Sequence, residues 1–177
     1  MPSIITNEEY RLWVHLRQTY DLLSSYEGDT FAKADITYEQ YLVLWIIKYF
    51  DFVKKDEPFI ITNLASILCR NIASVSQIVD RMEKKDLVKK IRDLPDRRAI
   101  RIVITRKGND IFSSNAKPNL SLVKDLFSVF NNGERKTLLR LIKKLRKKVT
   151  AEFGIVQVKP DVELNDNTNI DNFLKQL

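Results

Sequence analysis

Arginine and aspartate are concentrated in residues 92–105, which read RDLPDRRAIRIVIT. Four arginines and two aspartates lie around a proline there, and every second residue from 100 to 104 is isoleucine. This alternation predicts a half-buried strand. Because residues 87–93 alternate too, we predict a β-hairpin whose loop presents Arg97 and Arg98. A loop tip has no core to hold two guanidinium groups, so their partner is expected to come from outside the chain.

Basic residues gather in the segment around this hairpin. Of the 30 basic and 23 acidic residues in the chain, residues 62–108 hold 12 and 5, which leaves 18 of each elsewhere. The net charge of +7 therefore belongs to this segment. A local basic excess favours a polyanionic partner, either nucleic acid or an anionic membrane surface.

Two short helices are predicted directly before the hairpin. The first spans residues 63–69, and the second spans 72–85 with Asn71 as its N-cap. The outer face of the second helix carries Ser74, Gln77, Arg81 and Lys84. Two short helices joined by a tight turn, with small polar residues early on the second, are typical of a helix-turn-helix.

Longer helices are predicted on both sides of this unit. The first has Asn7 as its N-cap and extends to Gly28. The next spans 38–53 behind a capping box of Thr37 and Gln40, and its apolar composition predicts a central place in the core.

The C-terminal part is predicted to hold two helices and a tail. The first of these helices begins after Thr105 and reaches residue 130, with a kink or split at Pro118. The second is basic and amphipathic and spans residues 132–153. A final turn is expected at residues 170–177.

Residues 74–108, SVSQIVDRMEKKDLVKKIRDLPDRRAIRIVITRKG, resemble the MarR family of bacterial transcriptional regulators. They are similar to its recognition helix ending V-D-R-[LM]-E-K-K-G-L-V, its wing motif D-x-R and its closing L-T-x-K-G. The order of the helices extends the likeness to about residue 153. Asp86 departs from the usual glycine, although aspartate tolerates the left-handed conformation. Gln77 stands where a basic residue is frequent, so base preference does not carry over.

The resemblance implies a mainly α-helical fold with a small β-hairpin wing. Its parts would be an N-terminal dimerisation helix, a winged helix-turn-helix DNA-binding domain, C-terminal dimerisation helices and a tail: residues 1–36, 37–108, 109–153 and 154–177. A sequence-specific regulator, expected to repress, would bind a pseudo-palindromic operator in double-stranded DNA as a homodimer. Its recognition helices would enter the major groove and its wings the minor groove.

The family's wing motif maps onto three residues. Asp96 would orient Arg98 for the minor groove, and Arg97 would meet phosphate. Alternatively, Arg98 is a solvated loop arginine paired only with Asp96. The candidate DNA-contacting residues are Asn71, Ser74, Ser76, Gln77, Arg81, Lys84, Asp96, Arg97 and Arg98.

Several of these candidates have a structural alternative. Asn71 is a helix cap whatever else it does, and Arg81 would either touch phosphate or pair with Asp80 or Glu83. The lysines 84, 85, 89 and 90 suit diffuse electrostatic attraction better than specific contacts.

Aromatic residues recur on the first two long helices. In the family these helices line a pocket for aromatic or phenolic effectors, and the matching residues are Trp13, Tyr20, Tyr41, Trp45 and Tyr49. Aromatic residues at helical spacing are more often core than ligand site. A pocket for a small aromatic effector and plain core packing both remain open.

Residues for catalysis or metal binding are scarce. One cysteine excludes an internal disulfide and a Cys-based zinc site. We expect Cys69 to be a buried small hydrophobe and His15 to be packed or at an interface. No nucleophile with a matching base and no Gly-rich phosphate loop is evident, so no enzyme activity, cofactor or metal is expected.

Two rival functions remain. The chain could be a non-catalytic winged-helix module that binds nucleic acid nonspecifically or binds a protein. The leucine face of the basic helix within residues 135–148 would also suit a membrane surface, but the family order favours a dimer interface. Without a signal peptide or a long apolar run, a soluble cytoplasmic protein without a membrane partner is expected.

Overall fold

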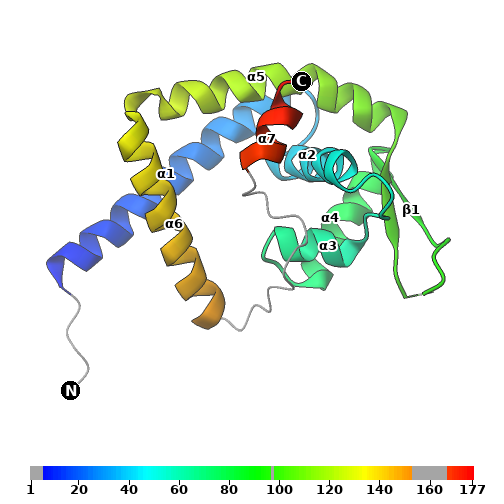
Figure 1. Cartoon of the computed structure of the whole chain (residues 1–177), viewed down its shortest axis with the longest axis horizontal. Coiled ribbons are helices and arrows are strands. Elements are labelled where there is room, and N and C mark those ends of the chain that lie inside the picture. The colour runs from blue at the N-terminus through cyan, green and yellow to red at the C-terminus, as the bar shows by residue number, and fades with distance from the viewer. Residues whose placement is uncertain (1–5, 97, 153–166) are drawn as a thin grey trace. The chain divides into compact units, whose positions relative to one another are not determined.

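A computed structural model describes residues 6–96, 98–152 and 167–177. The chain forms two compact units, Met1–Tyr41 and Leu42–Leu177. Both are helical, and the second also contains a two-stranded antiparallel sheet (Figure 1). The predicted fold class is confirmed.

The first unit is dominated by α1, Asn7–Ala32. Its N-cap is Thr6 and not Asn7, because the Thr6 hydroxyl accepts from the backbone N–H of Glu9 at 3.2 Å while the Glu9 carboxylate accepts from the Thr6 N–H at 2.8 Å. The helix also continues past its predicted end at Gly28. One internal glycine weakens a helix but does not terminate it.

Helix α2, Tyr38–Val53, has the predicted bounds and the predicted capping box. The N–H of Gln40 donates to the Thr37 hydroxyl at 3.1 Å, and the N–H of Thr37 donates back to the Gln40 amide oxygen at 3.2 Å. The central position is confirmed, because most apolar side chains of α2 are buried: Tyr41, Val43, Leu44, Ile46, Ile47, Tyr49 and Phe50.

Helices α3, Ile61–Ile67, and α4, Ile72–Lys84, form the predicted pair of short helices. Helix α3 begins and ends two residues earlier than predicted, because the Asn63 side chain caps it by accepting from the Ile60 N–H at 3.0 Å. Helix α4 ends as predicted with Asp86 in the left-handed region, at φ 55°. The Leu87 N–H donates to the Met82 carbonyl at 2.9 Å, which closes the helix.

The hairpin consists of β1, Val88–Ile91, and β2, Arg101–Ile104, with Val88 opposite Ile104. Both strands are shorter than predicted. A third segment extends the sheet, since the Ile102 N–H donates to the Phe59 carbonyl at 2.8 Å and the Ile61 N–H donates to the Ile100 carbonyl at 3.2 Å. The sequence analysis missed this contribution, which fastens the start of α3 to the wing.

The C-terminal elements are α5, Arg106–Leu126, the 3₁₀ turn η1, Phe127–Val129, α6, Asn132–Glu152, and α7, Asn167–Leu174. The predicted split at Pro118 is wrong, because α5 continues through it. Phe112, Ala116 and Asn119 are buried on both sides of the proline, and this packing offsets one lost backbone hydrogen bond. No described helix is long and apolar enough to cross a membrane.

Candidate nucleic-acid interface

Helix α4 presents a polar face opposite a buried apolar stripe. Val75, Ile78, Val79 and Met82 form the stripe. Gln77, Arg81 and Lys84 are exposed, whereas Ser74 and Ser76 are half-buried. Asn71 caps the helix by accepting from the Ser74 N–H at 2.8 Å and is itself exposed. The first backbone N–H groups of a helix have no carbonyl partner within the helix, so the first turn of α4 can bind an anion.

The wing loop is held by Asp96. Its carboxylate accepts from the backbone N–H of Arg98 at 2.9 Å, and its carbonyl accepts from the Ala99 N–H at 3.0 Å. The hydrogen bond from the Arg98 N–H to Asp96 thus fixes the backbone that carries the Arg98 side chain, and this side chain is exposed. Arg97 lies outside the described residues.

A concavity of about 270 Å³ separates the wing from the helix-turn-helix. Ser76 of α4 and the wing residues Asp96 and Arg98 line it together. Thr62 at the start of α3 and Ile72 at the start of α4 also line it. Three sequence-predicted residues, one from α4 and two from the wing loop, therefore border one space.

Ile72 is a candidate that the sequence analysis missed. Its spacing from Val75 and Val79 matches the buried stripe, so the pattern places it in the core. In the structure its side chain is 54% exposed because it stands at the open end of α4. An exposed apolar group here can contact a thymine methyl.

Lys90 joins the wing to α4. Its ammonium lies 2.7 Å from the Asp80 carboxylate and 3.1 Å from that of Glu83, and its backbone N–H donates to Glu83 at 2.9 Å. The hydrogen bond from the Lys90 backbone is the main reason that the pKa of Glu83 lies below its usual range. Lys90 was expected to act diffusely, but its charge is engaged locally.

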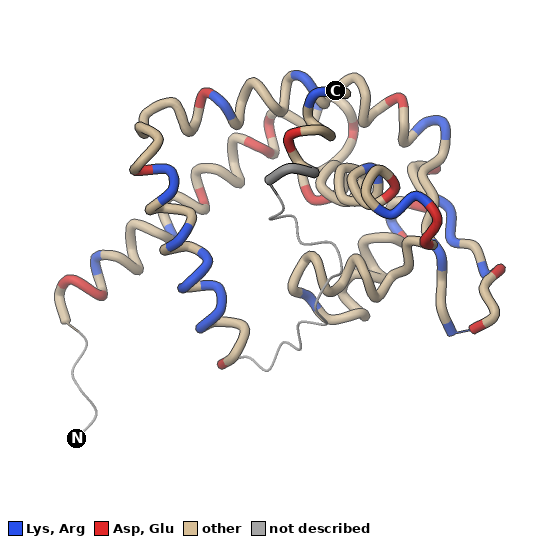
Figure 2. The backbone as a smooth tube through the Cα atoms, viewed as in Figure 1, with Lys and Arg blue, Asp and Glu red and all other residues tan. Residues whose placement is uncertain are grey.

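Arg101 is likewise structural, since it pairs with Asp93 where the two strands meet the wing loop. The hydrogen bonds from Arg101 lower the pKa of the Asp93 carboxyl. Lysine and arginine residues nevertheless lie along the hairpin and along α6 (Figure 2). The basic charge predicted for the hairpin segment is therefore partly neutralised by Asp80, Glu83 and Asp93, whereas Arg98 in the loop is exposed.

Comparison with known proteins decides the family. The sequence pattern of the MarR family matches residues 36–100. The HTH-type transcriptional regulator MgrA of Staphylococcus aureus is 32% identical over 123 residues, which cover 68% of this chain and 76% of MgrA. The chain belongs to the MarR family. It is accordingly a winged helix-turn-helix transcriptional regulator of a class that binds DNA.

Solved structures of the MarR family share its fold. The Staphylococcus aureus MepR–DNA complex superposes with a TM-score of 0.68 at 18% identity, covering 77% of this chain and 96% of MepR. The organohalide-sensing regulator RdhR in its 2,4-dichlorophenol-bound form gives a TM-score of 0.68 at 23% identity, covering 81% and 82%.

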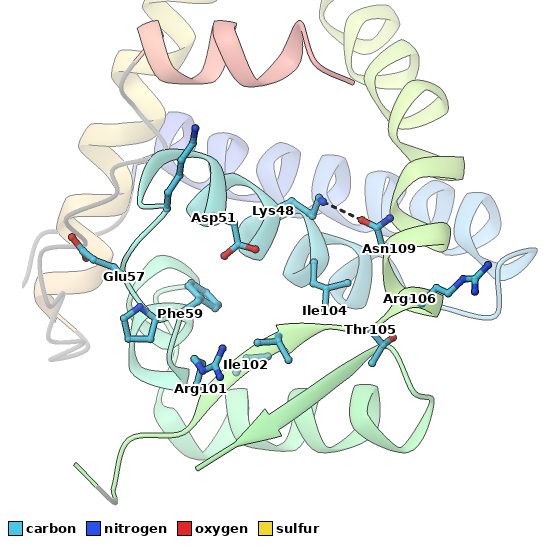
Figure 3. A pocket seen from close by; sticks show the side chains of 13 residues that line it. Lys48, Asp51, Glu57, Phe59, Arg101, Ile102, Ile104, Thr105, Arg106 and Asn109 are labelled. Atoms are coloured by element: carbon cyan, nitrogen blue, oxygen red, sulfur yellow. Dashed lines mark hydrogen bonds between the residues drawn. The ribbon is translucent and has the colours of Figure 1, made fainter. Parts of the chain in front are cut away.

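A second concavity, of about 530 Å³, lies on the other side of the sheet in this MarR-family protein (Figure 3). Lys48 of α2 donates to the Asn109 side chain of α5 at 3.0 Å beside it. Burial raises the pKa of Asp51 in the same lining, and Lys48 opposes that rise. The charged side chains of the lining are Lys48, Lys55, Arg101 and Arg106 with Asp51 and Glu57, so basic groups outnumber acidic ones.

The residues predicted for an effector pocket divide into three groups. Trp45 and Tyr49 stack with ring centroids 5.3 Å apart, and Phe173 of α7 contacts both. Tyr41 instead stacks on Phe31 at 4.7 Å. The side chains of Trp13 and Tyr20 are exposed on α1. The structure thus brings together Trp45 and Tyr49 and adds a ring that the prediction did not include.

Cys69 departs from its predicted setting, whereas for His15 the structure excludes only packing inside this chain and leaves the predicted interface role as a prediction. Cys69 is half-buried and occupies the left-handed position after α3, at φ 52°, so it is not a buried core residue. His15 is exposed on α1. Within the described ranges no three metal-ligating side chains gather in one place.

Proposed function

We propose that this MarR-family regulator works in the cytoplasm as a homodimeric repressor, without catalysis, on a pseudo-palindromic operator. The observation that carries the proposal is the shared concavity, in which Ser76 of the recognition helix faces Asp96 and Arg98 of the wing. A polar helix face beside a cationic hairpin fits one major groove and the adjacent minor groove.

Base readout is assigned to the first turns of α4. Ser74 and Gln77 would reach base edges or phosphates, and Ile72 would meet a thymine methyl. Asn71 would combine its capping role with a backbone contact. Arg81 and Lys84, farther along the same face, would bind phosphate and supply affinity without sequence preference.

The wing supplies the second part of the interface. Because Asp96 holds the loop backbone at Arg98, the guanidinium starts from a fixed position. A narrow minor groove concentrates negative potential and attracts such a side chain. Arg97 is assigned to phosphate.

A second copy of the chain is proposed as the partner of α1 and α6. Large apolar side chains are exposed on both helices: Leu12, Trp13, Leu16 and Tyr20 on α1, and Leu139, Leu141, Ile142, Leu145 and Val149 on α6. Soluble proteins rarely leave such apolar surface in water. Ile142, Leu145 and Val149 also follow the three- and four-residue spacing of a helix-packing seam.

A response to a small aromatic molecule is proposed as well. One solved relative, RdhR, is described in a form bound to 2,4-dichlorophenol. In this chain the stacked rings of Trp45 and Tyr49 offer a surface that a further ring can join. Such a molecule would change the operator affinity only by binding the free and DNA-bound conformations unequally.

Selection from a random pool of DNA duplexes tests the DNA-binding proposal. The expected product is an inverted repeat with half-site centres about one helical turn apart. Placed downstream of a promoter, that repeat should lower transcription in a reporter when the protein is present. A pool without enrichment would favour the alternative of a winged-helix module that binds nucleic acid nonspecifically or binds a protein.

A further inference from the structure

The tail helix α7 is attached to α2 through one aromatic side chain. Phe173 is 4% exposed. Its ring centroid lies 5.4 Å from that of Trp45 at 90°, 5.4 Å from that of Tyr49 at 73° and 5.6 Å from that of Phe52 at 49°. These edge-on and tilted arrangements are the favourable geometries for aromatic pairs.

The three receiving rings form one surface because of their spacing. Trp45, Tyr49 and Phe52 stand at positions i, i+4 and i+7 of α2, which share one face of a helix. Trp45 and Tyr49 also stack nearly parallel, at 17°. The result is a preformed aromatic surface, called here the α2 ring site, into which Phe173 inserts.

Helix α7 depends on this contact for its stability. An isolated helix of eight residues is too short to persist in water. Its neighbours Ile170 and Leu174 are half-buried, whereas Asp171, Asn172 and Lys175 are exposed. Among the described side chains of α7, only that of Phe173 is buried, so its docking and the folding of α7 are coupled.

We propose that the α2 ring site binds a neutral single aromatic ring and that Phe173 is its tethered occupant. A free aromatic compound then binds only by displacing α7. A tethered group competes at an effective concentration on the order of millimolar. The apparent affinity for the free compound is therefore reduced in proportion to the fraction of molecules in which α7 is undocked. This inference extends the proposed aromatic response and does not depend on DNA binding.

The test uses the full chain with Trp13→Phe, which leaves Trp45 as the single tryptophan because the chain has two. Tryptophan fluorescence is titrated with benzyl alcohol, and cyclohexylmethanol serves as the non-aromatic probe of similar size. In the Phe173→Ala variant, Trp45 emission should shift to the red, and benzyl alcohol should bind at least about tenfold more tightly than with Phe173 present. Asn172→Ala, an exposed change on the same helix, should behave like the parent.

A second measurement needs no change to the tail. Hydrogen exchange of the α7 amides in the natural chain should accelerate when benzyl alcohol is added and should not respond to cyclohexylmethanol. The proposal would be overturned if Trp45 emission and benzyl alcohol affinity were the same with and without Phe173. It would also be overturned if hydrogen exchange in α7 did not change when benzyl alcohol is added. Failure of benzyl alcohol to bind the Phe173→Ala variant would overturn it too. No DNA is present, so these outcomes are independent of operator binding.

Discussion

At the level of single residues, Arg98 is the side chain most directly tied to the proposed minor-groove contact. Arg98→Ala should lower affinity for the selected operator by about 1–3 kcal/mol, which is roughly 5- to 150-fold. Fluorescence anisotropy with a labelled duplex measures the loss. Lys117→Ala removes one exposed positive charge from α5 and should have little effect. Similar losses in both variants would mean that Arg98 contributes only bulk charge.

A substitution of Asp96 tests the same loop with a change of net charge opposite to that of Arg98→Ala. Asp96→Ala makes the protein more basic, which by charge alone should tighten binding to all DNA. Since the Asp96 carboxylate fixes the Arg98 backbone, we expect weaker binding to the operator and unchanged or tighter binding to scrambled DNA. Anisotropy titrations with the two duplexes separate these effects. Tighter binding to both would contradict the positioning role.

Glu83 gives a prediction about pH. Its folded pKa is lowered from 4.5, mainly by the Lys90 backbone N–H, so it stabilises the fold above pH 4.5 and the gain disappears as pH falls through the lower folded value. Glu83→Gln keeps an acceptor for that N–H but removes the charge. We expect a loss of less than about 1 kcal/mol at neutral pH, because the pair is partly exposed, and a weaker dependence of stability on acid. Urea unfolding at pH 7 and pH 3.5 measures both, and an unchanged difference between the two pH values would exclude the assignment.

At the level of elements, the junction between α5 and β1 leaves no room for a side chain. A Cβ on Gly108 would lie 2.1 Å from the Leu87 carbonyl oxygen, so Gly108→Ala should cost about 3 kcal/mol or more of unfolding free energy. Gly28 in α1 has no atom within 4 Å of its Cβ position, and Gly28→Ala should stabilise by about 0.5–1 kcal/mol. Denaturant unfolding compares the two. Equal effects would mean that the packing at Gly108 is not as described.

Local signals in the sequence predicted much of this architecture. The capping box of Thr37 and Gln40, the Asn71 cap and the left-handed Asp86 all depend on residues within a few positions of one another, and all three are present. The two helices of the helix-turn-helix and the hairpin were predicted for the same reason.

The features that were missed depend on tertiary contacts. The pairing of Ile60 with Arg101 joins segments about forty positions apart along the chain, and nothing local marks it. Pro118 was predicted to split a helix that packing on both sides preserves. Ile72 has the helical spacing of the buried residues of α4, yet its side chain is exposed at the N-terminal end of that helix. The partner of Phe173 is likewise set by the tertiary fold, because α7 meets α2 more than a hundred residues earlier.

At the level of the whole molecule, we expect a second copy of the chain to cover the exposed apolar faces of α1 and α6. Ile142→Asp places a charge in the α6 face, where the native side chain is 49% exposed, and should convert a dimer into monomers at micromolar concentration. Lys144→Asp, an exposed change two positions along, should leave the dimer intact. Sedimentation equilibrium distinguishes the states. A monomeric parent protein would contradict the proposed dimer. A membrane-surface role would be favoured instead if the protein bound vesicles and charge reversal at lysines 143, 144 and 147 abolished that binding.

The most direct test of operator binding is a titration of the purified protein against the DNA upstream of its own gene, with scrambled competitor, across a series of salt concentrations. We predict a saturable dimeric complex that survives competitor and remains at least about a thousandfold tighter than nonspecific binding at physiological salt. Binding that the competitor removes equally, with the same salt dependence for both duplexes, would contradict site-specific regulation.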